Sequence, residues 1–283
     1  MNGILIVNKP AGVTSRDVVN KLTKIFKTKK IGHTGTLDPL ATGVLVVCIG
    51  NTTKLCELLT SEYKEYVATI KLGLKTDTLD ITGNVLETKA FNINRQDIEK
   101  VFQTFLGPSI QTTPLYSAVK VNGKKLYEYA RAGLEVSLPK RQIDIQSIEL
   151  LKFADDEITF KTKVSKGTYI RALIDDICEK LNTVGTMSQL TRTEQGNFKL
   201  SEAYTISEIE QNNFKLITKE EAISDLETIN LTKEQYEKVK NGALIPKKFT
   251  NKIACLKYDN QIVAIYQEYP KDILLAKPYK MFI

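Results

Sequence analysis

The order in which strand-like and helix-like segments follow one another restricts the fold of this chain more than any other feature. Apolar residues alternate over residues 64–72, and two further strand-like runs flank a turn within residues 141–165. Apolar residues spaced by three and four predict a helix over residues 15–26 with Ser15 as its N-cap, and a second helix that Asn94 opens. Because no regular strand–helix–strand repeat runs through the chain, we expect an α+β fold.

Charge is spread unevenly along the 283 residues. Residues 1–60 and 231–283 each carry a net charge of +5, whereas residues 201–230 carry −5. An acidic, helix-like stretch between two basic parts is typical of a boundary between domains. We therefore place a boundary near residue 228 and predict a first domain over residues 1–228.

The basic tail, residues 229–283, has the pattern of a small β-rich domain. Strand-like runs at 252–258 and 261–266 are joined by Asp259 and Asn260. Lysines and aromatic side chains on such a module suit RNA binding, but the same composition also describes a solvated basic surface over a small core. The composition of the tail favours neither alternative.

Composition excludes several classes of protein. Hydrophobic residues make up 42% of the chain and charged residues 26%, as in ordinary soluble globular proteins. The longest apolar run, Val44–Ile49, is far shorter than the roughly 20 residues that a membrane span needs. The first residues lack the basic region of a signal peptide, and the four cysteines are scattered without a CxxC pair. The single histidine, His33, excludes a metal site built on several histidines, and we expect a cytoplasmic protein with reduced thiols.

A loop rich in glycine and threonine, residues 32–43, is the most informative segment for chemistry. Such a loop has constrained turns and a backbone open to close approach. Asp38 precedes Pro39, which biases the Asp38 backbone away from the helical region and places the carboxylate at a turn. An aspartate that only caps a turn is the simpler alternative. A phosphate-binding loop is disfavoured, because neither of the glycine-rich motifs that mark one occurs in the chain.

Motifs in six blocks resemble, in the same order, those of the TruB family of tRNA pseudouridine synthases. The central block is Gly32–Gly43, which reads GHTGTLDPLATG. The other blocks are Lys9–Ser15 (KPAGVTS), Tyr63–Tyr66 followed by Leu72–Asp80, Gln111–Lys120 followed by Gly123–Arg131, Ser165–Arg171 (SKGTYIR) and Leu190–Thr193 (LTRT). Together they span about residues 3–200, and a series of this length is far more specific than any single motif.

The resemblance implies a fold, an activity and a substrate. The fold is a pseudouridine-synthase catalytic domain, with a mixed, mainly antiparallel sheet flanked by helices, followed by a small PUA-like RNA-binding domain. The activity is the isomerisation of uridine 55 in the T loop of tRNA: the N1–C1′ bond breaks, the uracil turns, and C5 joins C1′. The resemblance also implies a monomer that needs no cofactor, metal, membrane or protein partner.

Two residues of these motifs imply the chemistry. Asp38 matches the catalytic aspartate of the family, and Arg171 matches the arginine that pairs with it. An ionised carboxylate in a site that excludes water is favoured by a nearby cation, and a guanidinium is always charged. Without its motif, Arg171 would be taken for a surface arginine on an amphipathic helix. Two routes stay open, because Asp38 either attacks C1′ directly or removes a proton to open a glycal route.

Four further residues match positions with which the family binds its substrate. Tyr66 matches the tyrosine stacked on the target base, and it is also a candidate for the C5 proton step. Tyr169 and Leu190 match residues that line the uridine pocket, whereas His33 matches the histidine that holds tRNA. Outside this context, Tyr66 and Leu190 would be core residues and His33 a turn histidine bonded to the backbone.

Supporting residues complete the predicted site. We expect Lys9 and Pro10 to support the catalytic loop rather than to touch the substrate. A basic cluster near the loop is expected to contact phosphates, and it consists of Lys24, Lys27, Lys29 and Lys30. Extruding a base from a folded RNA loop costs roughly a few kcal/mol, which shape recognition and phosphate contacts offset.

Other functions are weaker alternatives. A non-catalytic tRNA-binding or folding protein would keep the same surface, but it would have no need of Asp38, whose charge repels phosphate. A member of the family that works with guide RNA and partner proteins is disfavoured, since the sequence shows no lysine-rich extension. A nucleotide-binding enzyme comes last for want of a motif.

Thr191 departs from the family pattern, which often has Leu-Arg-Arg-Thr where this chain has Leu-Thr-Arg-Thr. A missing cation should weaken an RNA contact more than the chemistry. We therefore expect Thr191→Arg to increase the affinity for tRNA and to change turnover less, as measured by filter binding and single-turnover assays. Unchanged affinity would refute this expectation.

Overall fold

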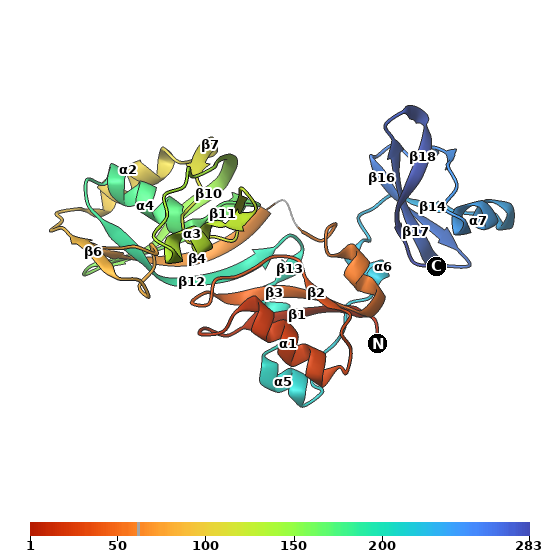
Figure 1. The fold of residues 1–283 in the computed structure, drawn as a ribbon, viewed down its shortest axis with the longest axis horizontal. Coiled ribbons are helices and arrows are strands. Elements are labelled where there is room, and N and C mark those ends of the chain that lie inside the picture. The colour runs from red at the N-terminus through yellow and green to blue at the C-terminus, as the bar shows by residue number, and fades with distance from the viewer. Residues whose placement is uncertain (61–62) are drawn as a thin grey trace.

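One long sheet carries most of the chain, and a second, smaller sheet forms the C-terminal end, as a computed structural model shows (Figure 1). The structure describes residues 1–60 and 63–283. The strands of the long sheet are β1 (Gly3–Lys9), β2 (Ile31–His33), β3 (Thr42–Ile49), β4 (Tyr63–Leu72), β7 (Gly107–Thr112), β10 (Lys140–Ala154), β11 (Glu157–Ser165), β12 (Gly185–Gln195) and β13 (Phe198–Lys199).

The long sheet consists of two antiparallel parts that meet at one short parallel contact. Its strand order is β1-β3-β12-β4-β11-β10-β7, with β2 beside β3 and β13 beside β12. Between β3 and β12, the register pairs Thr42 with Thr191 and Gly43 with Arg192, in parallel. The other pairings in this sheet are antiparallel, which confirms the predicted α+β fold with a mixed, mainly antiparallel sheet.

Helices cover the sheet in two places (Figure 1). Near the second part of the sheet lie α2 (Arg95–Gln103) and α4 (Ile170–Lys180), while α1 (Ser15–Ile25) and α5 (Ile206–Glu210) accompany β1 and β3. The remaining elements of this region are η1 (Gly50–Leu55), β5 (Leu74–Thr76), β6 (Val85–Thr88), β8 (Lys120–Val121), β9 (Lys124–Lys125), α3 (Leu126–Arg131), η2 (Leu200–Glu202) and α6 (Lys219–Ala222).

Local sequence explains where two of these helices begin. Asn94 caps α2 as predicted, because its side chain accepts a hydrogen bond from the Asp97 backbone N–H. The prediction that Ser15 caps α1 is wrong: Thr14 is the N-cap and forms a reciprocal capping box with Asp17. Ser15 is the first helical residue, and its hydroxyl turns instead toward the backbone of Leu37.

Both predicted hairpins are confirmed. The strands β10 and β11 are joined by Asp155 and Asp156, and Asp155 has a φ of 54°. In the C-terminal sheet, Asp259 and Asn260 have φ values of 50° and 58° and join β16 (Ile253–Tyr258) to β17 (Gln261–Tyr269). Aspartate and asparagine tolerate this left-handed conformation better than other non-glycine residues, which is why these pairs signal tight turns.

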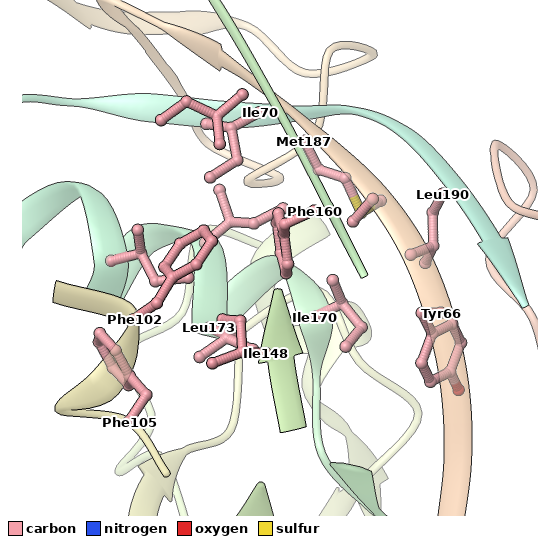
Figure 2. Close-up of a cluster of buried hydrophobic side chains, with 14 of the residues drawn as sticks. Tyr66, Ile70, Phe102, Phe105, Ile148, Phe160, Ile170, Leu173, Met187 and Leu190 are labelled. Atoms are coloured by element: carbon pink, nitrogen blue, oxygen red, sulfur yellow. The ribbon is translucent and has the colours of Figure 1, made fainter. Parts of the chain in front are cut away.

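The main hydrophobic core lies between the second part of the sheet and the helices α2 and α4. Phe102 and Phe160 pack in its interior, with ring centroids 5.5 Å apart. Figure 2 shows this cluster in close-up, with Tyr66 and Leu190 at one end and Phe102 and Phe105 at the other. Two of the residues that the sequence assigns to the substrate pocket therefore lie where the core ends.

The C-terminal sheet packs against the first domain through a shared hydrophobic cluster. Its order is β14-β16-β17-β18-β15, and it begins at Thr228, next to the predicted boundary. Its elements are β14 (Thr228–Asn230), α7 (Lys233–Lys240), β15 (Ile245–Pro246), β16 (Ile253–Tyr258), β17 (Gln261–Tyr269) and β18 (Asp272–Met281). Cys255 and Ile265 of this sheet belong to one cluster with Ile4 and Leu55. An ion pair of 2.8 Å between Lys280 and Glu57 joins the same two regions.

The described residues contain neither a membrane-spanning helix nor a cluster of metal-binding side chains. Among residues 1–60 and 63–283, no helix is long and apolar enough to cross a membrane. Within the same described ranges, no group of three or more histidine, cysteine, aspartate or glutamate side chains is arranged to hold a metal ion.

Gly43 is required where the two parts of the sheet meet. Its φ is +95°, and a Cβ built there would lie 2.3 Å from the carbonyl oxygen of Arg192. We expect Gly43→Ala to lower the free energy of unfolding by about 3 kcal/mol or more, because left-handed strain and a backbone clash add. Urea denaturation followed by circular dichroism measures this loss.

Gly133 provides the matched control. Its φ is +63°, but a Cβ there would meet nothing within 4 Å. Gly133→Ala should therefore lower the free energy of unfolding only by the left-handed strain, which is about 1–2 kcal/mol. Equal losses for the two variants would show that the close approach at Gly43 has no energetic consequence.

Candidate active site

A pocket of about 400 Å³ opens beside the contact between β3 and β12. The residues that line it come from the loop before β3, from β4, from the segment after β7, from the turn between β11 and α4, and from β12. Five of the predicted site residues line it together: Asp38, Tyr66, Tyr169, Arg171 and Leu190. They lie as far as 152 positions apart in the sequence, so the pocket is a product of the tertiary fold.

An ion pair between Asp38 and Arg171 forms the polar side of the pocket. Arg171 Nε donates to Asp38 Oδ2 over 2.9 Å. The Arg171 side chain is 6% exposed and that of Asp38 is 37% exposed, so the carboxylate faces the pocket while the guanidinium lies behind it. The two remaining guanidinium nitrogens donate to the carbonyls of Thr78 (2.8 Å) and Tyr116 (3.0 Å), which fixes the fork in one orientation.

The start of α4 is held so that Arg171 points at Asp38. Tyr169 is the N-cap of this helix, and its backbone N–H donates to Gln111 Oε1 over 2.8 Å. Gln111 Nε2 donates in return to the Tyr169 carbonyl over 3.1 Å. Because Gln111 is buried at the end of β7, this pair of hydrogen bonds ties the helix to the far edge of the sheet.

Lys9 binds the backbone on both sides of a contact between its own segment and the loop of Asp38. Its Nζ donates to the carbonyls of Pro10 (2.8 Å), Val13 (2.7 Å) and Pro39 (3.2 Å). Lys9 is fully buried, and this burial lowers its pKa from 10.5 to about 8, although the charge of Asp38 acts in the opposite direction. The lysine therefore acts as a buried clamp on the backbone around Asp38.

Arg192 holds the other end of the loop, and the prediction from sequence missed it. This fully buried arginine donates from Nε to the Val44 carbonyl (2.7 Å) and from Nη2 to the Gly35 carbonyl (3.1 Å). A longer contact of 3.5 Å joins Nη1 to the carbonyl of Thr36. The signal for it was present in the Leu190–Thr193 block, but the sequence alone does not reveal that the partners of the arginine lie near residue 35.

Aromatic and apolar side chains also line the pocket. Tyr66 and Leu190 are 8% and 7% exposed, and they reach the pocket from adjacent strands β4 and β12. The ring of Tyr169 lies under the guanidinium of Arg141, with 5.3 Å between the guanidinium carbon and the ring centroid. A flat base would find a platform here, since aromatic faces stack on bases without regard to sequence.

Two lysines that the prediction did not assign also line the pocket. Lys64 lies two residues before Tyr66 on β4 and is 8% exposed, whereas Lys166 is exposed in the turn before α4. The pKa of Lys64 is lowered to about 8, first by burial and then by the charges of Arg192 and Lys166. The strand period of two places Lys64 and Tyr66 on the same face, which is the signal that could have found Lys64.

The structure does not bring the remaining predicted residues into the pocket. His33 ends β2 next to Thr34; it is half-buried, burial lowers its pKa, and its Nδ1 has no hydrogen-bond partner among the described residues. Pro10 is exposed, and its carbonyl accepts from Lys9. The four lysines of the basic cluster are exposed near the end of α1, and they are Lys24, Lys27, Lys29 and Lys30. Thr191 is half-buried, with its hydroxyl 2.9 Å from that of Thr42.

Comparison with known proteins now decides the family. Residues 23–170 match the family model described as the N-terminal domain of TruB family pseudouridylate synthases. The chain is 43% identical over 303 aligned residues to the tRNA pseudouridine synthase B of Bacillus subtilis (strain 168), covering 100% of this chain and 98% of that protein. The chain belongs to the TruB family. It is 40% identical to the protein of the same name from Geobacillus thermodenitrificans (strain NG80-2), with complete coverage of both chains.

Solved structures of complexes that contain Cbf5 have a chain of the same fold. One chain in "Crystal Structure of a Cbf5-Nop10-Gar1 Complex" matches with a TM-score of 0.75 and 25% identity, covering 99% of this chain and 85% of that one. A second match, in an archaeal box H/ACA Nop10–Cbf5 complex, has a TM-score of 0.72 at 23% identity. The TruB-family fold, with its β-rich, PUA-like C-terminal domain, is thereby confirmed. As a TruB-family member the protein is a pseudouridine synthase.

The buried Lys9 makes stability depend on pH. An unfolded lysine keeps its proton to about pH 10.5, whereas Lys9 in the folded protein releases it near pH 8. Between these values the unfolded state binds more protons, so the free energy of unfolding should rise with pH. Lys9→Met should remove part of this rise, as measured by urea denaturation at pH 7.5 and pH 9.5.

Lys100→Met is the control, because Lys100 is exposed at the end of α2, far from the loop in sequence. Lys100→Met should leave the rise in the free energy of unfolding between pH 7.5 and pH 9.5 as it is in the unmodified protein. If Lys9→Met also leaves the rise intact, the clamp does not lose its proton in this range.

Proposed function

We propose that the protein converts uridine 55 in the T loop of tRNA to pseudouridine, with Asp38 at the glycosidic carbon. The observation that carries this proposal is the Asp38 carboxylate, which lies on the wall of a pocket and is fixed by Arg171 opposite Tyr66 and Leu190. The names of the relatives from Bacillus subtilis and Geobacillus thermodenitrificans support tRNA as the substrate.

The reaction is an isomerisation, so its atoms balance without a co-reactant. The N1–C1′ bond breaks, the uracil turns within the pocket, and the C5–C1′ bond forms. The proton leaves C5, and N1 holds one in the product. The protein has to stabilise charge at C1′, hold the detached base, and move this proton.

Asp38 supplies the negative charge that the reaction needs at C1′. When the glycosidic bond breaks, positive charge develops at C1′, as in glycoside hydrolysis, and a fixed carboxylate stabilises it. Arg171 pairs with that carboxylate and orients it, and the guanidinium stays charged because it does not lose its proton. Direct attack of Asp38 on C1′ and removal of a sugar proton both use the carboxylate form.

The apolar wall holds the base. Stacking on Tyr66 offers about 1–3 kcal/mol per base, which offsets the cost of extruding the uridine from the T loop. Leu190 and Tyr169 close the space around the ring. The exposed lysines near the end of α1 and the basic C-terminal tail provide phosphate contacts outside the pocket, so binding should weaken as salt is raised.

Tritium release from tRNA labelled at uridine C5 tests the role of Asp38. We expect the unmodified protein to release about one equivalent per tRNA, and Asp38→Asn to slow release by about 10³-fold or more, because the isosteric amide cannot stabilise charge at C1′. The affinity for tRNA, measured by filter binding, should change far less.

Glu99→Gln is the matched control, since it neutralises an exposed carboxylate on α2 that pairs only with Arg95 among the described residues. It should release tritium at the normal rate. Tight, salt-sensitive binding of tRNA without any release by the unmodified protein would refute the proposal and favour a tRNA-binding protein.

A further inference from the structure

Two paired residues of the long sheet hold Tyr169 together, and the chemistry described so far gives one of them no role. Gln111 of β7 pairs with Arg141 of β10 in the antiparallel register. Side chains of directly paired residues lie on the same face of a sheet. Gln111 binds the backbone N–H and the carbonyl of Tyr169, whereas Arg141 covers its ring. The pair therefore grips both the backbone and the side chain of one pocket residue.

Arg141 contacts the turn before α4 at two points. Its guanidinium carbon lies 5.3 Å from the centroid of the Tyr169 ring, and its Nη1 donates to the Gly167 carbonyl over 3.3 Å. A guanidinium is flat and weakly hydrated, so it stacks well on an aromatic face. The buried Nε of Arg141 has no hydrogen-bond partner among the described residues. The ring and the carbonyl are thus the contacts that place this head group.

Gly167 has no side chain at the point where Arg141 reaches the turn. Its φ is +87°, and a Cβ built there would lie 3.0 Å from Arg141 Nη1. Because this distance is shorter than an ordinary van der Waals contact, a side chain here would press on the guanidinium. The turn therefore leaves room for the arginine two residues before the ring that it covers.

The backbone contacts of Tyr169 leave the direction of its ring open. Tyr169 is the N-cap of α4, but its side chain forms no capping hydrogen bond. Gln111 holds only the backbone of the tyrosine. Because Tyr169 lines the pocket, the direction of its ring affects the space that a base can occupy. A cation held over the ring restricts its rotation.

We propose that Arg141 is a positioning residue for the isomerisation, which holds the ring of Tyr169 in place as a wall of the uridine pocket. This inference rests on the proposed function, because it assumes that the target uridine occupies that pocket. In the described part of the chain, Arg141 is not one of the residues that line the pocket, so it acts through Tyr169. A detached uracil has to turn without leaving, and a fixed wall restricts its motion to that turn. The rate of isomerisation should therefore depend on Arg141 more than the affinity for tRNA does.

Single-turnover tritium release over a range of protein concentrations separates the rate from binding. We expect Arg141→Met to lower the maximal rate constant about 10- to 100-fold, because a small misplacement of pocket groups has effects of this size. The protein concentration at half-maximal rate, and its dependence on salt, should stay as in the unmodified protein. Arg141→Lys should regain part of the rate, since an ammonium keeps the charge over the ring. Circular dichroism checks that the variants fold, and Arg141→Gln is a second uncharged variant.

A double-mutant cycle shows whether Arg141 acts through the ring. Tyr169→Leu removes the ring, and adding Arg141→Met should then lower the rate no further. An optical measurement gives the same information without turnover. The chain has no tryptophan, so Tyr169→Trp introduces a single indole signal. Acrylamide should quench this indole more strongly once Arg141→Met is added.

Lys180→Met is the matched control. Lys180 lies at the other end of α4, with its Nζ 4.3 Å from the centroid of the Phe105 ring. Loss of this second cation over an aromatic ring should change neither the rate of tritium release nor the quenching of the indole.

Several results would overturn the inference. If Arg141→Met weakens tRNA binding and lowers the salt slope of log K by about one, the arginine binds a phosphate. If the rate losses of Arg141→Met and Tyr169→Leu multiply, or if quenching of the indole is unchanged, Arg141 does not act through the ring. A normal rate for Arg141→Met refutes the inference alone, whereas no release by the unmodified protein refutes the proposed function.

Discussion

The contact between β3 and β12 is the constraint on which the rest of the site depends. Among the described residues, strands of the two antiparallel parts of the sheet pair only there, and Gly43 lets the backbones approach because it has no side chain. The guanidinium of Arg192 fills the space beside this contact and binds three carbonyls of the loop and of β3. The loop of Asp38 is thus anchored to the sheet junction itself, and the pocket opens where the two parts diverge.

Several buried side chains at this junction are positively charged. Lys9 and Arg192 lie under the loop, Arg171 lies behind Asp38, and Lys64 faces the pocket. A buried charge is costly alone, and carbonyl oxygens or the Asp38 carboxylate compensate Lys9, Arg192 and Arg171. The charge of Arg171 thus lies within hydrogen-bonding distance of the carboxylate that the proposed chemistry at C1′ uses.

Local features of the fold could be predicted from the sequence, because they depend on residues close to one another in the chain. Asn94 as a helix cap and the turns at Asp155 and Asp259 are of this kind. Ser15 was misassigned because Thr14 offers the same capping chemistry one residue earlier, and only the distant Leu37 distinguishes them. The motifs named the residues around Asp38, but the anchoring by Arg192 spans more than 150 residues, and no local pattern carries that information.

Several hydrogen bonds hold the loop of Asp38 through its backbone. Lys9 and Arg192 bind carbonyls, and Ser15 binds the N–H and the carbonyl of Leu37. These contacts do not involve the side chains of Thr36 and Asp38. Substitutions at Thr36 or Asp38 can therefore change the chemistry of the pocket without unfolding the loop. The chemistry of this site can evolve while the architecture around it stays the same.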